Sequence, residues 1–478
     1  MRNKIKNLQE GINKVIDSEG NTYEGNNLKE MRSKLGNLLD KEEQYWIQQS
    51  RVSWLKEGDR NTQFFHARAT NRKKKNNIAR LKDINGHWRE NTTDICMAIR
   101  EYFQRLFKSN LNSNSTLNLD YIDRCIPGEA NDKLLKNFTD NEIKEAFNQM
   151  DPRKALGIDG LSGNFFIENW DVVRGDVLKL CHDILRGDKN VDCLNDTTIV
   201  LIPKIKELVD MTNFRPIRLY RVVYKIMAKV LANRLKETLP LCISQNQSAF
   251  VPERMIHDNI LIAHELVHYL HKGFVIKLDI SKAYDRVEWT FIEEVMKKMG
   301  YANEWVTKIM SCVRSIRYVV KCNSILSETI VPERGLRQGD PLSPFLLLFY
   351  MEAFSKLLIH AQTNNILKGI RASINGPRIN HLFFADDALL FIRNKKMDVE
   401  EIANIMASFS HDSGQEINKD KSMIMFSTKT PEAQKDLFSS MLGMRIVDKL
   451  DNYLGLPLPV GRKNHLLSLT SLIGVHAG

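Results

Sequence analysis

The stretch from residue 381 to residue 392 constrains the fold more than any other part of the chain. Two adjacent carboxylates, Asp386 and Asp387, separate two short apolar runs rich in Phe, Leu and Ile. Such runs are typical of buried strands, and an Asp-Asp pair favours a tight turn because both side chains accept hydrogen bonds from nearby backbone. We therefore predict a β-hairpin with two negative charges at its tip. This pair is costly unless a cation neutralises it, so Mg²⁺ binding and an ordinary solvated turn are the two hypotheses.

The composition favours a polyanionic partner. The chain has 478 residues, enough for two or three domains, and 69 Lys and Arg against 58 Asp and Glu give a net charge of +11. A basic balance of this kind suits nucleic acid without naming it. The seven cysteines are scattered without metal-ligand spacing, which argues against a disulfide framework or zinc site. No apolar run approaches the length of a membrane span and no secretory signal is evident, so we expect no membrane association.

The first part of the chain predicts a basic, mostly helical extension over residues 1–110. Apolar positions in residues 1–50 recur at helical spacing, which indicates two amphipathic helices interrupted at 18–27. Residues 51–75 mix aromatic and basic side chains, which suits phosphate contact and base stacking. For this stretch alone, a solvated basic helix face is the better explanation. Two short strands should flank the Asn85-Gly86 turn. The Ser- and Asn-rich stretch 108–118 opens a linker that we place at residues 111–139.

A third carboxylate follows another predicted strand. Residues 274–278 form a short apolar run that ends at Asp279, and a helix is predicted over 284–299. If this strand neighbours the 381–392 hairpin, three carboxylates converge at one end of a sheet. That arrangement suits two divalent ions roughly 3.5–4 Å apart, as used for in-line phosphoryl transfer. For Asp279 alone, a helix N-cap is an equally good explanation.

Several segments together resemble the reverse transcriptases of plant LINE-type (non-LTR) retrotransposons. The matching segments are residues 54–66, 213–217, 247–252, 277–289, 334–344, 384–387, 413–422 and 453–457. Their order along the chain is the order in that family. Any one of them would be a weak signal, whereas the ordered set is specific.

The resemblance implies a metal-dependent catalytic centre. It implies two Mg²⁺ ions, replaceable by Mn²⁺, held by Asp279 and Asp386 with Asp387 beside them and the Ile280 carbonyl as a further ligand. It also implies that Lys421 is the acid that protonates the leaving pyrophosphate.

The resemblance further implies a set of substrate-binding residues. They are Tyr284, Gln338, Gly339, Lys204, Arg215 and Arg337. Tyr284 is expected to act as a steric gate that excludes a ribose 2′-OH and so favours dNTPs. Gly339 and its neighbours are expected to line the nucleotide and template pocket, because glycine permits close backbone approach. Lys204 and Arg215 are expected to grip the triphosphate.

Some positions depart from the family pattern. Glu253 stands where the family usually has Gly, which matters if the turn needs a positive φ. Arg218 lies in a run where the family has smaller side chains, and Leu156 and Ile158 replace two prolines. None of these departures removes an expected metal ligand.

The fold expected from this resemblance is α+β, with the palm and fingers of a right-hand polymerase. The reverse transcriptase domain is predicted at residues 140–455, with fingers at 140–270 and palm at 271–455. Residues 456–478 are expected to be the truncated start of a thumb or an aberrant tail. No segment before residue 40 resembles the endonuclease that family members carry.

The predicted function is that of an RNA-directed DNA polymerase of a non-LTR retroelement. Its partners would be an RNA template, a DNA primer and dNTPs, with no obligate protein partner, and its location would be the nucleus. Two alternatives remain: a catalytically inactive nucleic-acid-binding remnant, and a protein like a group II intron maturase.

Overall fold

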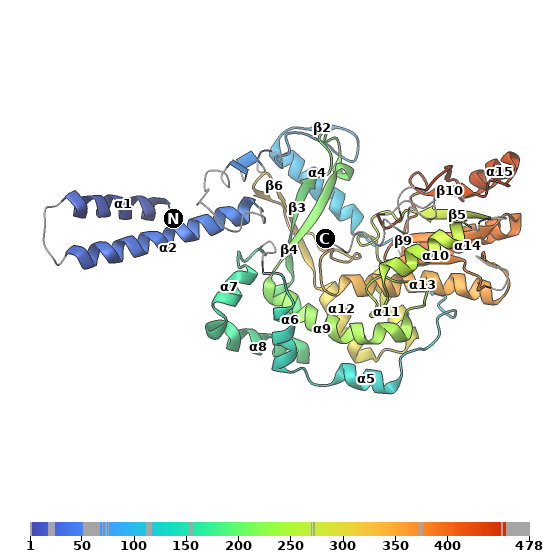
Figure 1. The fold of residues 1–478 in the computed structure, drawn as a ribbon, viewed down its shortest axis with the longest axis horizontal. Helices are drawn as coiled ribbons and strands as arrows, with labels where there is room; N and C mark the ends of the chain where they lie inside the picture. Colours follow the sequence, from blue (N-terminus) through green and yellow to red (C-terminus); the bar gives the residue numbers. More distant parts are fainter. Residues whose placement is uncertain are drawn as a thin grey trace. The chain divides into compact units, whose positions relative to one another are not determined.

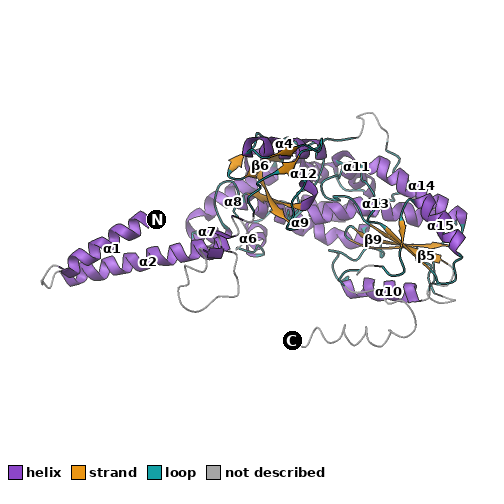
Figure 2. Cartoon of the chain, turned by 90° about the horizontal axis from the view of Figure 1, so that it is seen from above, coloured by secondary structure: helices purple, strands orange, loops and turns teal. Residues whose placement is uncertain are grey.

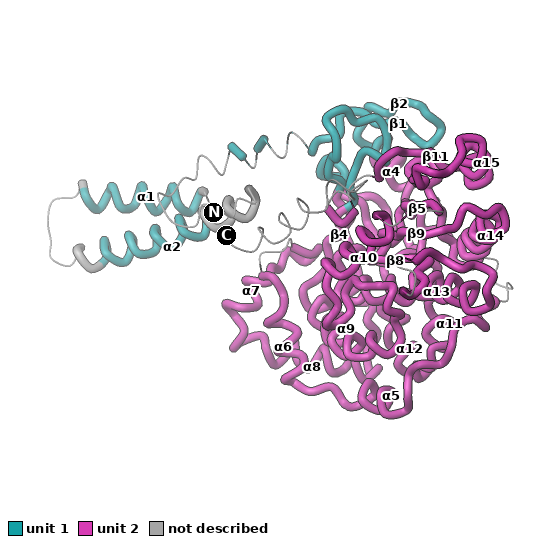
Figure 3. Tube along the Cα trace, turned by 45° about the vertical axis from the view of Figure 1, so that its right-hand side comes forward, with its two compact units in different colours: residues 1–95, 201–216, 322–325 teal, residues 96–200, 217–321, 326–478 magenta. Residues whose placement is uncertain are grey.

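The protein is described by a computed structural model over most of its length. The described residues are 2–17, 24–50, 67, 68, 70, 71, 74, 76–110, 117–152, 156–268, 270, 273–371, 376–450 and 453–455. The chain divides into two compact units (Figure 3). Unit 1 comprises residues 1–95, 201–216 and 322–325, and unit 2 comprises residues 96–200, 217–321 and 326–478. These units cut across the predicted fingers and palm, so the predicted domain boundaries stay predictions.

Unit 1 begins with a helical hairpin. Helices α1 (Arg2–Asp17) and α2 (Glu24–Ser50) lie side by side (Figure 1). Ile5 and Ile12 are buried, and a spacing of seven residues places both on one face of α1. Gly11 permits close packing, because a Cβ atom there would lie 2.8 Å from Cε of Met31. The prediction of two amphipathic helices is confirmed, and each supplies the partner that the other needs.

A short β-hairpin follows in unit 1. Strands β1 (Leu81–Lys82) and β2 (Trp88–Arg89) pair antiparallel, and Gly86 has a φ of +83° in the turn. The Asp83 carboxylate accepts hydrogen bonds of 2.9 Å from the backbone N–H groups of Asn85 and His87. The predicted hairpin is therefore confirmed. The 54–66 motif and part of the basic run at 72–75 lie outside the described residues.

The remaining elements alternate helices and strands. They are α4 (Thr92–Leu106), α5 (Gly128–Leu135), α6 (Asp140–Asn148), α7 (Gly163–Glu168), α8 (Trp170–Arg186), η1 (Val191–Leu194), β3 (Asp196–Pro203), η2 (Met211–Asn213), β4 (Phe214–Tyr220), α9 (Val222–Cys242), α10 (Ile256–His268), β5 (Gly273–Leu278), α11 (Trp289–Met299), α12 (Asn303–Arg314), β6 (Arg317–Cys322), β7 (Ile325–Leu326), α13 (Ser343–Thr363), β8 (His381–Phe384), β9 (Asp387–Arg393), α14 (Lys396–Ser413), β10 (Met423–Phe426), α15 (Glu432–Leu442) and β11 (Arg445–Ile446). The strand predicted at residues 274–278 is present as β5, and the hairpin predicted at residues 381–392 is present as β8 and β9.

Unit 2 contains a five-stranded sheet in the order β11-β10-β5-β9-β8. The central strand β5 pairs antiparallel with both β9 and β10, and β10 pairs parallel with β11. A second sheet has the order β4-β3-β6-β7, in which β3 and β6 are parallel. Helices combined with a mainly antiparallel sheet agree with the predicted α+β class.

Both faces of the five-stranded sheet are covered. Phe274 and Ile276 of β5 belong to the large hydrophobic cluster that includes side chains of α13 and α14. Val275, which points to the opposite face because side chains alternate along a strand, belongs to a second cluster with Ala263 and Leu266 of α10. Figure 2 shows β5 and β9 between α10 on one side and α13 and α14 on the other. Burial on both faces explains why these strands are continuously apolar in the sequence.

Helix α13 differs from one expectation. It has 21 residues and is apolar enough, by length and composition, to cross a membrane, although we expected no run of that length in the chain. In the structure 67% of its most apolar window is buried. The central helix of a hydrophobic core passes the same test, and Leu346, Phe349 and Phe354 of α13 are all buried in the main cluster.

The helix predicted over residues 284–299 starts five residues later than expected. Helix α11 begins at Trp289, and residues 281–286 form turns in which Lys282 has a φ of +52°. The Tyr284 carbonyl accepts a hydrogen bond of 2.6 Å from the backbone N–H of Leu336. This tertiary bond takes the acceptor that a helix would have used, so the prediction was wrong for residues 284–288.

Candidate active site

Three carboxylates gather at one end of the five-stranded sheet. The register of β5 and β9 pairs Leu278 with Ala388, so the next residues along each strand, Asp279 and Asp387, face each other. Asp386 lies in the turn just before Asp387. The convergence predicted from the two strand ends is therefore present.

The turn that carries Asp386 is a two-residue hairpin loop. Phe384 pairs with Asp387, which leaves Ala385 and Asp386 as the central residues. Ala385 has a φ of +54°. A positive φ at the first central position is a feature of type II′ turns, in which glycine is usual at that place. An alanine there is strained, so neighbouring groups must hold the turn.

Burial and mutual repulsion perturb the two aspartates of the turn. Burial raises the pKa of Asp386, and the charge of Asp279 raises it further. The pKa of Asp387 is also raised, by partial loss of hydration and then by Asp386, while Lys277 acts in the opposite direction. Lys277 is two residues from Asp279 on the same strand, so both lie on one face. Lys277 is absent from the site residues expected from the sequence, although the alternation of side chains along a strand predicts its place beside Asp279.

The segment 417–422 holds the backbone around Asp279. The Asp279 N–H donates to Oγ of Ser422 over 3.1 Å, and the Asn418 N–H donates to the Asp279 carbonyl over 2.8 Å. Ile280 forms an isolated antiparallel bridge with Ile417. Strand β10 pairs antiparallel with β5, with Met423 opposite Lys277. The exposed Lys421 lies two residues before Met423 and therefore at the sheet end that carries Asp279.

Tyr284 lies close to the carboxylates. Its side chain is half-buried, and burial together with the charge of Asp386 raises its pKa to about 12. The phenol is therefore protonated at neutral pH. The expected role of Tyr284 as a steric gate stays a prediction.

The loop 334–341 divides into buried anchors and an exposed tip. The Asp340 N–H donates to the Arg337 carbonyl over 3.1 Å, and Gly339 has a φ of +90°. These features describe a type II β-turn with glycine at the position that requires positive φ. Gln338 and Gly339 are exposed at its tip, so both are accessible to a ligand.

Arg337 does not occupy the place expected of a substrate-binding residue. It is 1% exposed, and its guanidinium donates to Oγ1 of Thr197 over 2.7 Å and also to the Asn195 side chain. Its Nε lies 3.2 Å from Oδ2 of Asp340. These protein partners occupy the guanidinium, so we assign Arg337 to anchoring the loop, as a correction of the expected substrate contact.

The structure accounts for the departure at 218, whereas the departure at 253 is unfavourable to the backbone. Arg218 is buried and forms an ion pair with Asp285, next to Tyr284, and its guanidinium lies 5.6 Å from the ring centroid of Tyr318. Glu253 has a φ of +66°. That turn does require a positive φ, so a glutamate there carries backbone strain that a glycine would avoid.

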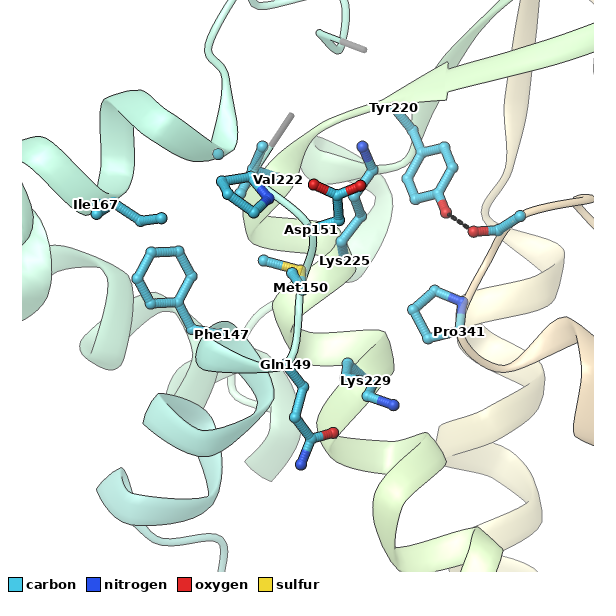
Figure 4. Close-up of a pocket in the computed structure, with 13 residues that line it drawn as sticks. Phe147, Gln149, Met150, Asp151, Ile167, Tyr220, Val222, Lys225, Lys229 and Pro341 are labelled. Carbon is cyan, nitrogen blue, oxygen red and sulfur yellow. Dashed lines mark hydrogen bonds between the residues drawn. The ribbon is translucent and has the colours of Figure 1, made fainter. Parts of the chain in front are cut away.

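Gly339 also borders a pocket of about 200 Å³ (Figure 4). The pocket is lined by Phe147, Gln149, Met150, Asp151, Pro152, Gly163, Ile167, Tyr220, Val222, Lys225, Lys229, Gly339 and Pro341. The Tyr220 hydroxyl donates to the Gly339 carbonyl over 2.6 Å. Lys225 and Lys229 are one turn apart on α9 and so share a face. The lining combines apolar side chains, two amines and the Asp151 carboxylate. The expectation that Gly339 lines a nucleotide or template pocket stays a prediction.

Lys204 and Arg215, the expected triphosphate contacts, both belong to unit 1. Lys204 follows β3 and Arg215 lies in β4. The Lys204 N–H donates to the Asn213 carbonyl over 2.8 Å, and its Nζ donates to the Thr212 carbonyl over 3.0 Å. Both side chains are exposed. Because the carboxylates belong to unit 2, a joint contact with triphosphate stays a prediction.

The residues present fit divalent cations. Carboxylate oxygens are the ligands that Mg²⁺ prefers. The pKa values of Asp386 and Asp387 are raised first by burial and then by the charges of the neighbouring aspartates, and a bound cation would offset both effects. Within the described part of the chain, no group of three or more His, Cys, Asp or Glu is arranged to hold a metal ion by itself. In phosphoryl-transfer sites Mg²⁺ typically uses one or two carboxylates together with water and substrate phosphates.

Comparison with known proteins agrees with this geometry. Residues 202–458 match the family described as reverse transcriptase (RNA-dependent DNA polymerase). The chain is 27% identical over 399 residues to the transposon TX1 uncharacterized 149 kDa protein of Xenopus laevis, covering 82% of this chain and 30% of that protein. It is 26% identical over 255 residues to the Pol polyprotein of the Drosophila melanogaster retrotransposable element R2DM, covering 52% and 23%.

A shorter match links the chain to a plant protein. It is 59% identical over 58 residues to an uncharacterized mitochondrial protein of Arabidopsis thaliana, covering 12% of this chain and 48% of that protein. The chain spans less than a third of the length of the transposon TX1 and R2DM proteins. The matched family covers more than half of the chain and includes all three aspartates. The chain therefore belongs to the reverse transcriptase family.

Proposed function

We propose that this chain is an RNA-directed DNA polymerase that adds dNTPs to the 3′-OH of a primer paired with an RNA template. The carrying observation is the β5–β9 register, which brings Asp279 to Asp387 and Asp386 at one sheet end. Family membership and the two retroelement relatives support the same activity. The net charge of +11 suits a nucleic-acid partner.

Asp279, Asp386 and Asp387 would hold two Mg²⁺ or Mn²⁺ ions. When bound, such ions lower the pKa of an attacking hydroxyl and neutralise charge on a leaving pyrophosphate. The two-residue turn that begins at Ala385 places Asp386 at the end of strands β8 and β9.

The other residues would bind and orient the substrates. The Tyr284 ring beside Asp386 would exclude a ribose 2′-OH. The exposed tip of Gln338 and Gly339 would contact the nucleotide or the template. Lys421, exposed at the sheet end that carries Asp279, would supply a proton to the leaving pyrophosphate.

The test is primer extension by the full chain on a poly-rA template with an oligo-dT primer, with Mg²⁺ or Mn²⁺. We expect dNTP incorporation that Asp386→Ala abolishes. Wild-type extension no greater than that of Asp386→Ala, at saturating protein, would contradict the proposal. If salt-sensitive RNA binding persisted in that case, the protein would instead be a nucleic-acid-binding remnant, with a slope of roughly −0.7 per phosphate contact for single strands.

We also infer that the source element is a plant non-LTR retrotransposon acting in the nucleus. The short, strong match to an Arabidopsis thaliana protein supports the plant origin. The nuclear location rests on the resemblance to elements that copy RNA at a chromosomal nick. A fluorescent fusion of the full chain in plant cells would test it, and exclusion from the nucleus would contradict it.

A further inference from the structure

The segment around Gln247 lies along the edge of the five-stranded sheet, next to the carboxylate turn. Strand β8 is the edge strand, and Gln247 forms an isolated parallel bridge with Phe383. The Phe383 N–H donates to the Asn246 carbonyl over 2.7 Å, and the Ser248 N–H donates to the Phe383 carbonyl over 3.2 Å. The segment therefore covers backbone groups of β8 that an uncovered edge would expose.

The Gln247 side chain reaches the strained residue of the turn. Its Oε1 accepts a hydrogen bond of 2.9 Å from the Ala385 N–H, and its Nε2 donates to the Ala385 carbonyl over 3.2 Å. Gln247 is 1% exposed. Both backbone polar groups of the residue with φ +54° are thus held by one buried amide, and no other element of the hairpin supplies that restraint among the bonds described.

A second layer supports the same hairpin. Asn259 of α10 donates from Nδ2 to the Phe383 carbonyl over 2.8 Å and to Oγ of Ser248 over 3.2 Å. The Tyr453 hydroxyl donates to Oδ1 of Asn259 over 2.8 Å. All these residues belong to unit 2. The segments that begin at Gln247 and Tyr453 therefore both contact the β8–β9 hairpin. Neither segment has an assigned role in the proposed reaction.

We propose that Gln247 is a positioning residue that clamps the Ala385 peptide and so fixes the direction of the Asp386 carboxylate. The inference rests on the proposed polymerase function. Gln247 itself touches neither of the two aspartates through a described bond, so it acts through the turn. Without the clamp, Ala385 would relax towards negative φ, because left-handed backbone is unfavourable for alanine, and the carboxylate would move with it.

The experiment compares Gln247→Met, Ala385→Gly and the double variant in the full chain. Methionine keeps the side-chain volume but makes neither hydrogen bond. We expect Gln247→Met to lower kcat on the order of 10²-fold, the size of effect that a displacement of about 1 Å produces, with little change in KM for dNTP. Glycine adopts positive φ without steric cost, so Ala385→Gly should restore part of kcat in the Gln247→Met background.

The matched control is Asn131→Leu. The Asn131 side chain also clamps a turn, because its Nδ2 donates to the Gly300 carbonyl over 2.8 Å and its Oδ1 accepts from the Ala302 N–H over 2.8 Å. The Asn131→Leu variant should lose about as much stability as Gln247→Met does, but its kcat should equal that of wild type. An equal loss of kcat in Asn131→Leu, or no rescue by Ala385→Gly, would overturn the positioning role.

Equilibrium unfolding separates this inference from the polymerase proposal. If Gln247 clamps Ala385, Gln247→Met should reduce the free energy of unfolding less in the Ala385→Gly background than in wild type. Additive effects would overturn the clamp whether or not the chain polymerises. If Gln247→Met fails to fold, Gln247→Asn serves instead, because its neutral amide is one methylene shorter and cannot reach both backbone groups of Ala385. Coupling without any primer extension would support the clamp and contradict the polymerase function.

Discussion

Two groups of carboxylates in unit 2 have opposite surroundings. Asp285, Glu288 and Asp340 are buried, and each pairs with an arginine: Arg218, Arg334 and Arg337 respectively. Asp279, Asp386 and Asp387 lie at the end of the sheet, and no salt bridge joins them to an arginine among the described residues. The protein therefore neutralises the first group internally with arginines, whereas Lys277 offsets the second group only in part, at Asp387.

The two groups of carboxylates differ in role: the buried pairs hold segments of the fold together, and the sheet-end aspartates are the candidate catalytic groups. The buried pairs join distant segments: Glu288 also accepts a hydrogen bond of 2.8 Å from the Ser109 hydroxyl, and Arg334 donates to the Leu106 carbonyl over 3.0 Å. A buried pair contributes little net stability, but the loss of one partner is severe. At the sheet end, by contrast, the charges of the aspartates raise one another's pKa. Perturbed carboxylates of this kind are typical of functional sites.

The largest expected effect comes from removing a charge at the sheet end. Asp386→Asn should lower primer extension by about 10³-fold or more, since charge stabilisation in the transition state is lost. The same change should stabilise the metal-free protein at pH 7. The folded pKa of Asp386 is raised, so its favourable contribution is present below the unfolded value of 3.8 and is lost as pH rises through the folded pKa.

Thermal unfolding with EDTA and with Mg²⁺ checks that contrast. Mg²⁺ should raise the Tm of wild type more than that of Asp386→Asn. A variant that is less stable than wild type in EDTA at pH 7 would show that the aspartate is compensated internally, as the paired carboxylates are.

The second effect comes from breaking a buried pair. Arg337→Met should reduce the free energy of unfolding by about 3 kcal/mol, because it leaves Asp340 buried and uncompensated. Urea unfolding measures it. Arg105→Met is the control: Arg105 and Glu101 form an exposed pair at 3.0 Å, which should contribute under about 1 kcal/mol. Similar losses in both variants would remove the distinction between buried and exposed pairs.

One further carboxylate is buried and forms no salt bridge among the described residues, although the charges of Lys356 and Arg254 act on it. Glu352 of α13 is 1% exposed, its Oε2 accepts from the Ser244 hydroxyl over 3.1 Å, and burial raises its pKa to about 8. Its contribution to stability is full below pH 4.5 and is lost as pH rises towards 8, by at most about 1.4 kcal/mol per pH unit. Unfolding of Glu352→Gln between pH 5 and pH 8 should show a smaller dependence on pH, and an unchanged slope would contradict a neutral buried acid.

The smallest expected effect on stability comes from Glu253, whose backbone conformation matters more than its charge. Glu253 is exposed with a φ of +66°, so Glu253→Gly should stabilise the protein by roughly 0.5–1 kcal/mol, the strain relieved less the entropy that glycine loses. Glu253→Gln removes the charge and keeps the strain, so it should have almost no effect. Equal stabilisation by both variants in chemical denaturation would show that the charge, not the backbone, is responsible.

Much of the site could be predicted from residues alone. Strands ending at Asp279 and flanking Asp386 and Asp387 were evident from short apolar runs, because strands buried on both faces leave that pattern. The α1–α2 hairpin and the turn at Gly86 were evident from periodicity and turn chemistry. The start of α11 was not, because the tertiary bond from Leu336 N–H to the Tyr284 carbonyl overrides a local helical pattern.

The role of Arg337 was also beyond local pattern. An arginine in a glycine-bearing loop can either contact a substrate or be buried in the protein. The bonds of Arg337 to Thr197 and Asp340 show that it is buried. Arg218 was a departure without an explanation until Asp285 proved to be its partner. Gln247 likewise gave no signal of its contact with Ala385, because the two residues are far apart in the chain.

By itself the sequence determined the order of strands, helices and turns, because that order depends on local periodicity. It also determined the reverse transcriptase motifs and which three aspartates are the candidate metal ligands, because these depend on residue type. Only the tertiary structure decided which charges are neutralised by arginines, which loop residues are buried, and what holds the strained turn at Ala385. These properties depend on contacts between segments distant in the chain, and the energy of a charge or a polar group depends on what surrounds it after folding.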